Sequence, residues 1–279
     1  MIRSVLLFSL GFMFILQQAD AQALTAKQIV SNPEVLHARL RMANPDYRDQ
    51  AQFADDPESG LIGDFSGGGV TDLTPLRGIP FRVLDLRGLQ ISDITPLKGM
   101  PLLVLGLEET GVTDLRPLAG MRLGKLYLNG TAVSDLGPLA GMPLTELMLV
   151  ETHVKDIRPL RGLPIQQLWL NDTKVQDIAP LAECPLVSLT LEATPVSDLR
   201  PLAKISSLER LHIAGTRVND LTPLRGLKLQ RLIFTPGNIK AGLDIVRGMK
   251  TITEIGTTLD NRMPPDKFWQ QFDQGRKSK

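Results

Sequence analysis

The sequence has a single cysteine, Cys184, so no disulfide bond can form within the chain and the fold has to be stable through packing alone. It also has no excess of one charge, because 31 Lys and Arg residues stand against 30 Asp and Glu residues. A nearly neutral chain has no strong single-sign field with which to hold nucleic acid or an anionic membrane. We therefore expect no nucleic-acid partner.

Histidines are scarce, and the three that are present, His37, His153 and His212, lie far apart in the chain. No two of them have the spacing of metal ligands, and no Ser or Cys stands in a nucleophile motif. Cys184 occupies a position at which other segments of the chain have Met or Leu, which indicates a core residue. These features predict a protein that is not an enzyme and that has no cofactor and no metal site.

The apolar run at residues 5–16 is too short to span a bilayer. Arg3 precedes the run, and Ala19, Ala21 and Ala23 follow it with the small-residue spacing of a signal-peptidase site. Residues 1–23 are therefore predicted to be a signal peptide, with an uncleaved membrane anchor as the alternative. Removal of this segment would leave a secreted or periplasmic protein that does not insert into a membrane.

What the sequence does have is a repeat. A Pro-Leu pair recurs at intervals of 21 residues, and once of 22, with its proline at Pro75, Pro96, Pro117, Pro138, Pro159, Pro180, Pro201 and Pro223. A Leu-x-apolar pattern keeps the same period and begins at Leu84, Leu105, Leu126, Leu147, Leu168, Leu189, Leu211 and Leu232. A period of this length predicts a solenoid, in which apolar residues are buried by stacking of neighbouring coils.

One coil illustrates the pattern. Leu105 and Leu107 lie on the same face of a short strand, Thr110 turns the chain, and residues 114–118 return along the far side. The unit resembles a leucine-rich repeat, and its Asp-Leu-x-Pro-Leu return resembles the short repeats of bacterial internalin-type proteins. Thr at the place of the usual Asn resembles repeats of planctomycete-type bacterial proteins, which often stand beside a kinase domain.

This resemblance implies an α/β solenoid with a parallel β-sheet on the concave face, short helical turns on the convex face, and helical caps at both ends. We assign residues 24–59 to an N-terminal helical cap, 60–258 to the repeat array, and 259–279 to a C-terminal cap and tail.

The caps have helix signals of their own. Thr25 and Gln28 form a capping-box pattern, and Asn32 before Pro33 predicts the N-cap of a helix that ends before Asn44. Near the other end, Asn238 is the predicted N-cap of a helix that covers the last coils.

Two polar columns repeat with the coils. Carboxylates precede each return segment and are predicted to accept backbone N–H bonds as caps, with a metal-binding ladder as the alternative; they are Asp72, Asp93, Asp114, Asp135, Asp156, Asp177, Asp198 and Asp220. Hydroxyls follow each strand and are predicted to bond the backbone at the turn, with an ice-binding ladder as the alternative; they are Thr110, Thr131, Thr152, Thr173, Thr194 and Thr216.

The predicted partner site lies on the concave face of the solenoid, where the residues that alternate with the buried leucines point outward. Tyr127, Met148 and Trp169 are consecutive in the central column, Val150 stands beside Met148, and His212 lies further along. We predict that these five residues contact a protein or peptide partner, because an aromatic centre with a polar rim is typical of recognition sites. The alternatives are a structural or envelope scaffold, and an exported relative of a repeat domain from a larger signalling protein.

Overall fold

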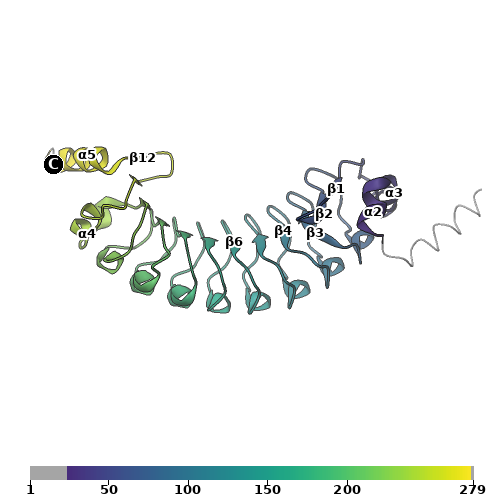
Figure 1. The fold of residues 1–279 in the computed structure, drawn as a ribbon, viewed down its shortest axis with the longest axis horizontal. Coiled ribbons are helices and arrows are strands. Elements are labelled where there is room, and N and C mark those ends of the chain that lie inside the picture. Colours follow the sequence, from purple (N-terminus) through teal and green to yellow (C-terminus); the bar gives the residue numbers. More distant parts are fainter. Residues whose placement is uncertain (1–23, 278–279) are drawn as a thin grey trace, which may run out of the picture.

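A computed structural model describes residues 24–277, and the predicted signal peptide lies outside the described residues. The chain forms a curved solenoid, with the β-sheet along the inside of the arc and short helical turns along the outside (Figure 1). The leucine-rich repeat fold predicted from the sequence is confirmed. None of the helices within the described part of the chain combines the length and the apolar character that crossing a membrane requires.

The sheet has 12 strands that follow one another in chain order. Strands β2 to β11 pair in parallel, whereas β1 and β12 pair antiparallel with their neighbours and close the two edges. The strands are β1 (Gln52–Asp56), β2 (Gly60–Asp64), β3 (Phe81–Asp85), β4 (Val104–Gly106), β5 (Lys125–Tyr127), β6 (Glu146–Met148), β7 (Gln167–Trp169), β8 (Ser188–Thr190), β9 (Arg210–His212), β10 (Arg231–Ile233), β11 (Glu254–Gly256) and β12 (Arg262–Met263).

Each return segment forms a 3₁₀ turn that begins at the residue before its proline. The turns are η1 (Thr74–Leu76), η2 (Thr95–Leu97), η3 (Arg116–Leu118), η4 (Gly137–Leu139), η5 (Arg158–Leu160), η6 (Ala179–Glu183), η7 (Arg200–Lys204), η8 (Thr222–Leu224) and, outside the repeat pattern, η9 (Pro236–Asn238). In η1 to η8 an aspartate stands two residues before the first residue of the turn and is well placed as a cap. All eight aspartates accept the amide N–H of the turn's first residue at 2.7 to 2.9 Å. The capping role predicted for this column is confirmed.

Glycine ends most of these turns, because the chain there needs a positive φ. Gly120 has φ 75° and Gly141 has φ 76° at the second residue after the leucine of the turn. Two coils have Glu183 and Lys204 at that position, and there the 3₁₀ turn runs on to five residues instead of three. A residue with a Cβ is strained at positive φ, so these two coils extend the helical turn where the others leave it.

The threonine column lies inside the solenoid. Each hydroxyl donates to the carbonyl oxygen of the residue three positions earlier at 2.6 to 2.8 Å. The side chains are buried, with at most 6% of their surface exposed. The turn role is therefore confirmed, and a buried column does not form an ice-binding surface.

The N-terminal cap consists of α2 (Ala26–Ser31), α3 (Glu34–Ala43) and the β1–β2 hairpin. The predicted capping box between Thr25 and Gln28 is present. The predicted N-cap at Asn32 is wrong: Pro33 is the N-cap residue of α3, and Asn32 ends α2. Strand β1 was not expected, because residues 50–59 are polar and acidic and lack an apolar alternation.

The C-terminal cap consists of α4 (Leu243–Arg247), the β11–β12 pair and α5 (Pro265–Lys277). The predicted N-cap at Asn238 is wrong, because Asn238 ends η9, and α4 is one short turn that begins after Gly242. Helix α5 packs its aromatic side over the last coils. Phe268 and Trp269 are buried, and the Phe268 ring lies 5.9 Å from that of Phe234.

Candidate functional site

The centre of the concave face carries an apolar strip over three consecutive strands. Tyr127 on β5 is paired with Met148 on β6, and Met148 is paired with Trp169 on β7. Val150 follows β6 on the same face. All four side chains are partly exposed. We call Tyr127, Met148, Val150 and Trp169 the concave ribbon. With about 4.8 Å between neighbouring strands, its three central side chains are in reach of one another.

One edge of the ribbon is fixed by Glu146. Its carboxylate accepts a hydrogen bond from the Tyr127 hydroxyl at 3.1 Å and forms an ion pair with Lys125, whose Nζ lies 3.1 Å away. Burial, and then the negative charge of Glu146, raise the pKa of Tyr127 to about 12. The ring is therefore neutral and oriented before any partner arrives.

The other edge is fixed by two asparagines. Asn129 Oδ1 accepts the amide N–H of Val150 at 2.9 Å, and its Nδ2 lies 3.6 Å from Met148 Sδ. Asn171 Nδ2 donates to Glu192 at 3.2 Å, and the Thr190 hydroxyl donates to Asn171 Oδ1. These bonds hold the polar rim in one arrangement, which reduces the side-chain entropy that the rim residues would lose when a partner binds.

The structure does not place His212 on this exposed surface. Its side chain lies in the same column, but only 3% of it is exposed, and the next residue of the column, Ile233, is fully buried. Neither ring nitrogen has a hydrogen-bond partner, and the Glu192 carboxylate lies 3.7 Å from Nδ1. Burial lowers the pKa of His212, although the charge of Glu192 opposes the shift. The exposed part of the column therefore ends before β8, where Thr190 is also buried.

A recess on the same face was not predicted. It adjoins the ribbon on the side of β3 and β4, has a volume of about 240 Å³, and lies over Gly106, which separates Asp85 from Tyr127 in the central column. The feature of the sequence that indicates the recess is Gly106, which has no side chain and lies between Asp85 and Tyr127 in the central column.

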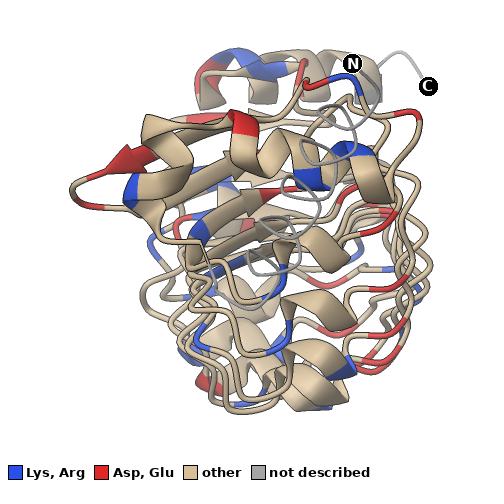
Figure 2. Ribbon diagram, turned by 90° about the vertical axis from the view of Figure 1, so that its right-hand side faces the viewer, with Lys and Arg blue, Asp and Glu red and all other residues tan. Residues whose placement is uncertain are grey.

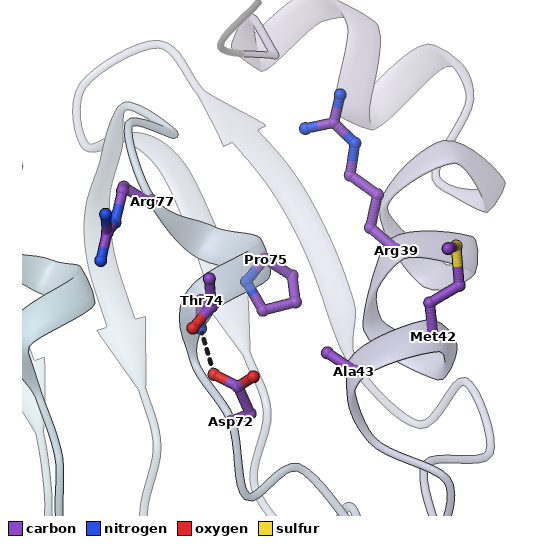
Figure 3. A pocket seen from close by; sticks show the side chains of 7 residues that line it. All are labelled: Arg39, Met42, Ala43, Asp72, Thr74, Pro75 and Arg77. Carbon is purple, nitrogen blue, oxygen red and sulfur yellow. Dashed lines mark hydrogen bonds between the residues drawn. The ribbon is translucent and has the colours of Figure 1, made fainter. Parts of the chain in front are cut away.

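A larger hollow of about 510 Å³ lies on the outer side, between α3 and η1 (Figure 3). Arg39 and Met42 project from α3, Arg77 stands on the far side, and Asp72 accepts the N–H of Thr74 at 2.7 Å. The two guanidinium groups do not converge on a common point in this view. The hollow is a groove where the cap meets the first coil, and its side chains form no catalytic constellation.

The described residues contain no group of three or more His, Cys, Asp or Glu side chains that could hold a metal ion. Cys184 is buried, its thiol lies 3.4 Å from the Leu160 carbonyl oxygen, and burial raises the pKa of that thiol. It has the environment of a core residue. Figure 2 shows basic and acidic residues interspersed along the ribbon, with no side that is basic alone.

Comparison with solved structures agrees with the architecture. Internalin C2 from Listeria monocytogenes is 30% identical, with a TM-score of 0.58 over 63% of this chain and 80% of that chain. The chain is a bacterial leucine-rich repeat protein. No family model matches it, and a comparison with curated proteins finds no match.

Two more distant structures share the fold of this leucine-rich repeat protein. One is a leucine-rich repeat protein of Leptospira interrogans, 19% identical, with a TM-score of 0.51 over 64% of this chain and 59% of that chain. The other is the ectodomain of the Arabidopsis thaliana receptor kinase GASSHO1/SCHENGEN3 in complex with CASPARIAN STRIP INTEGRITY FACTOR 2. It is 16% identical, with a TM-score of 0.57 over 78% of this chain and 31% of that chain.

Proposed function

We propose that this leucine-rich repeat protein is exported, is not an enzyme, and binds a protein or peptide partner on its concave sheet. The observation that carries the proposal is the concave ribbon. Aromatic and thioether side chains stand partly exposed on three adjacent strands, inside a rim of polar groups that are already hydrogen-bonded.

The composition of the ribbon supports binding rather than folding. The leucines that alternate with it, Leu126, Leu147 and Leu168, are fully buried and supply the core. Tyr127, Met148 and Trp169 keep exposed surface, so part of their apolar area is available to a partner. Large, stiff aromatic side chains lose little entropy on binding, and Trp and Tyr are among the residues that dominate binding energy at interfaces.

The comparisons support this proposal at the level of the fold. One structure with the same architecture, the GASSHO1/SCHENGEN3 ectodomain, is in complex with CASPARIAN STRIP INTEGRITY FACTOR 2. That observation shows that such a solenoid is compatible with partner binding, and it identifies no partner for this chain. Export rests on the sequence of residues 1–23. N-terminal sequencing of protein made in its own host should find a mature chain that begins near Gln22 or Leu24, and a cytosolic chain that retains Met1 would contradict it.

The partner can be sought with the mature protein as bait, in envelope extract and culture fluid of the bacterium that makes it. The affinity of a recovered partner is then measured for the wild type and for Trp169→Ala combined with Met148→Ser. Loss of a hot spot should weaken binding by about 2 kcal/mol or more, which is about 30-fold. Circular dichroism and a urea melt check that the variant remains folded.

The N-terminal cap offers a matched control. Val35 and Met42 are exposed apolar residues of α3, with 37% and 72% of their surface accessible. Val35→Ser combined with Met42→Ser removes exposed apolar surface away from the ribbon and should leave the affinity unchanged. Equal affinity of wild type and ribbon variant would exclude the concave ribbon as the binding site. Association with the cell wall and no recovered partner would favour a scaffold.

A further inference from the structure

The recess over Gly106 is bordered by the carboxylates of Asp85 and Glu108, which lie beside the space that a side chain at residue 106 would occupy. A Cβ placed on Gly106 would lie 3.0 Å from Glu108 Oε2 and 3.3 Å from Asp85 Oδ1. Both carboxylates therefore border the space that a side chain in this column would fill. Val83 and Val104 on one side and Tyr127 on the other form the remaining walls.

The two carboxylates differ in their partners. Asp85 is paired with Arg87, whose Nε lies 3.2 Å and 3.1 Å from the two carboxylate oxygens. Glu108 Oε2 is buried and has no hydrogen-bond partner. A buried carboxylate oxygen without a donor costs free energy, because it has lost its water without gaining a replacement.

The basic side chains on the neighbouring coils, Arg87 and Lys125, are each paired with another carboxylate. Arg87 is engaged with Asp85, and Lys125 forms its ion pair with Glu146 at 3.1 Å. Hydrogen bonding to Asp85 is the main cause that raises the pKa of Arg87, and the charges of Glu108 and Asp64 raise it further, so this one guanidinium is shared among three carboxylates. The recess therefore has a surplus of negative charge.

We propose that this recess receives a basic side chain, Lys or Arg, of the protein or peptide that binds the concave ribbon. The inference rests on the proposed function and adds a specificity to it. The cationic head would form an ion pair with the carboxylate of Glu108, whose side chain is partly exposed, and its apolar stem would lie against Val83, Val104 and the Tyr127 ring. Long basic side chains bury their stems in this way, and a cation near a tyrosine ring gains further attraction.

An anionic group would fit the recess less well. The only basic group that lines it, Arg87, already satisfies Asp85, and two carboxylates would repel a third negative charge. An apolar side chain of the same length would fill the space but leave Glu108 without a donor. Charge, and not size alone, is the property that the recess selects.

The test uses three small probes on the full mature chain: N-acetyl-lysine amide, N-acetyl-arginine amide and N-acetyl-norleucine amide. The norleucine probe has a side chain like that of lysine without the ammonium group. Amide resonances of Gly106 and its neighbours are followed by NMR during titration. A basic probe should give saturable shifts at Gly106, with affinity at least tenfold higher than that of the norleucine probe.

Two variants decide the outcome. Glu108→Gln keeps the shape of the side chain and removes its charge, and it should lower the affinity for the basic probes at least tenfold. Glu109→Gln removes an exposed charge next to it in the sequence and should leave the affinity unchanged. Resonances elsewhere in the sheet show that both variants are folded.

Equal binding of the norleucine probe, equal binding by Glu108→Gln, or no saturable shift at Gly106 would overturn the inference. None of these results bears on Trp169 and Met148. If the basic probes do not bind the recess but the Trp169→Ala and Met148→Ser variant still binds its partner more weakly than the wild type does, the proposed function stands and only the recess inference is wrong. If the ribbon variant binds the partner with the affinity of the wild type, the proposed function is wrong.

Discussion

The hydroxyl of Tyr127 on β5 donates a 3.1 Å hydrogen bond to the carboxylate of Glu146 on β6. The bond crosses the sheet diagonally, because the direct partner of Tyr127 is Met148. It ties an aromatic residue of the ribbon to the polar rim, so the orientation of the ring is set by the neighbouring coil. A repeat protein can build a fixed surface in this way from coils that are each too small to fold alone.

The tyrosines of the folded protein should resist ionisation by alkali. The chain has two, Tyr47 and Tyr127, and burial is the main cause that raises the pKa of each to about 12. Because each folded pKa lies above the unfolded value of about 10, their contribution to stability is complete below pH 10 and is lost as the pH rises through about 12. Ultraviolet difference spectroscopy measures the titration, with Tyr47→Phe to isolate Tyr127. A midpoint near 10 in folded protein would contradict the partial burial of the Tyr127 ring.

Stability should also fall on the acid side of neutrality because of His212. Burial lowers its pKa below the ordinary value of 6.5, so the unfolded chain binds the proton more tightly than the folded chain does. The contribution of the neutral ring is complete above pH 6.5 and decreases as the pH falls below it. Urea melts between about pH 7 and pH 5 should show a loss for wild type that is smaller in His212→Leu. Equal slopes for the two proteins would show that His212 is not buried as a neutral ring.

Asp177 should stabilise its turn through a single hydrogen bond, whereas Asp114, Asp156 and Asp198 also form ion pairs with an arginine. Asp177 accepts the N–H of Ala179 at 2.8 Å, and the neighbouring position carries no arginine that could add an ion pair. Asp177→Ala should lower the free energy of unfolding by about 1 kcal/mol, as loss of a cap usually does, whereas Asp177→Asn keeps an acceptor oxygen and should lose less. Denaturant melts measure both. Stabilisation of the wild type by added calcium that disappears in Asp177→Ala would instead indicate a metal site.

One replacement should make the protein more stable. Ala193 has φ 56°, and the corresponding residue of the next coil is Gly215 with φ 68°. Left-handed backbone costs a residue with a Cβ about 1 to 2 kcal/mol, and glycine loses about 0.5 to 1 kcal/mol more entropy on folding. Ala193→Gly should therefore gain roughly 0.5 to 1 kcal/mol.

The control for this replacement is Ala140, which follows η4 at φ −57°. Ala140→Gly relieves no strain and should reduce stability, so the two Ala-to-Gly variants should shift the thermal midpoint in opposite directions. Shifts in the same direction would contradict the strain assigned to Ala193.

The repeat array could be predicted from the sequence because every position in it is set by stacking. Leu147 has to be buried in its coil for the same reason that Leu126 is buried in the preceding one, and eight coils repeat that constraint. The register of the sheet follows, and with it the place of Tyr127, Met148 and Trp169 on the concave face. The glycine and aspartate positions are local backbone chemistry and were equally predictable.

The ends and the burial of particular outward residues were not predictable in this way. Strand β1 forms because the β2 edge needs a hydrogen-bonding partner, which a polar sequence supplies as well as an apolar one. His212 is buried by its surroundings in three dimensions, which the repeat does not encode. The recess over Gly106 depends on which side chains lie on both sides of one glycine, a relationship between three coils.

The central claim is that a partner docks on the concave ribbon, and the fluorescence of Trp169 tests it most directly. The chain has two tryptophans, and the other, Trp269, is buried in the C-terminal cap. In a Trp269→Phe variant, the emission of Trp169 alone reports on the ribbon. Titration with a partner recovered from the host should shift this emission to shorter wavelength, because the ring loses water. The dissociation constant from this titration should equal the one that calorimetry gives. Calorimetric binding with unchanged Trp169 emission would contradict docking on this face.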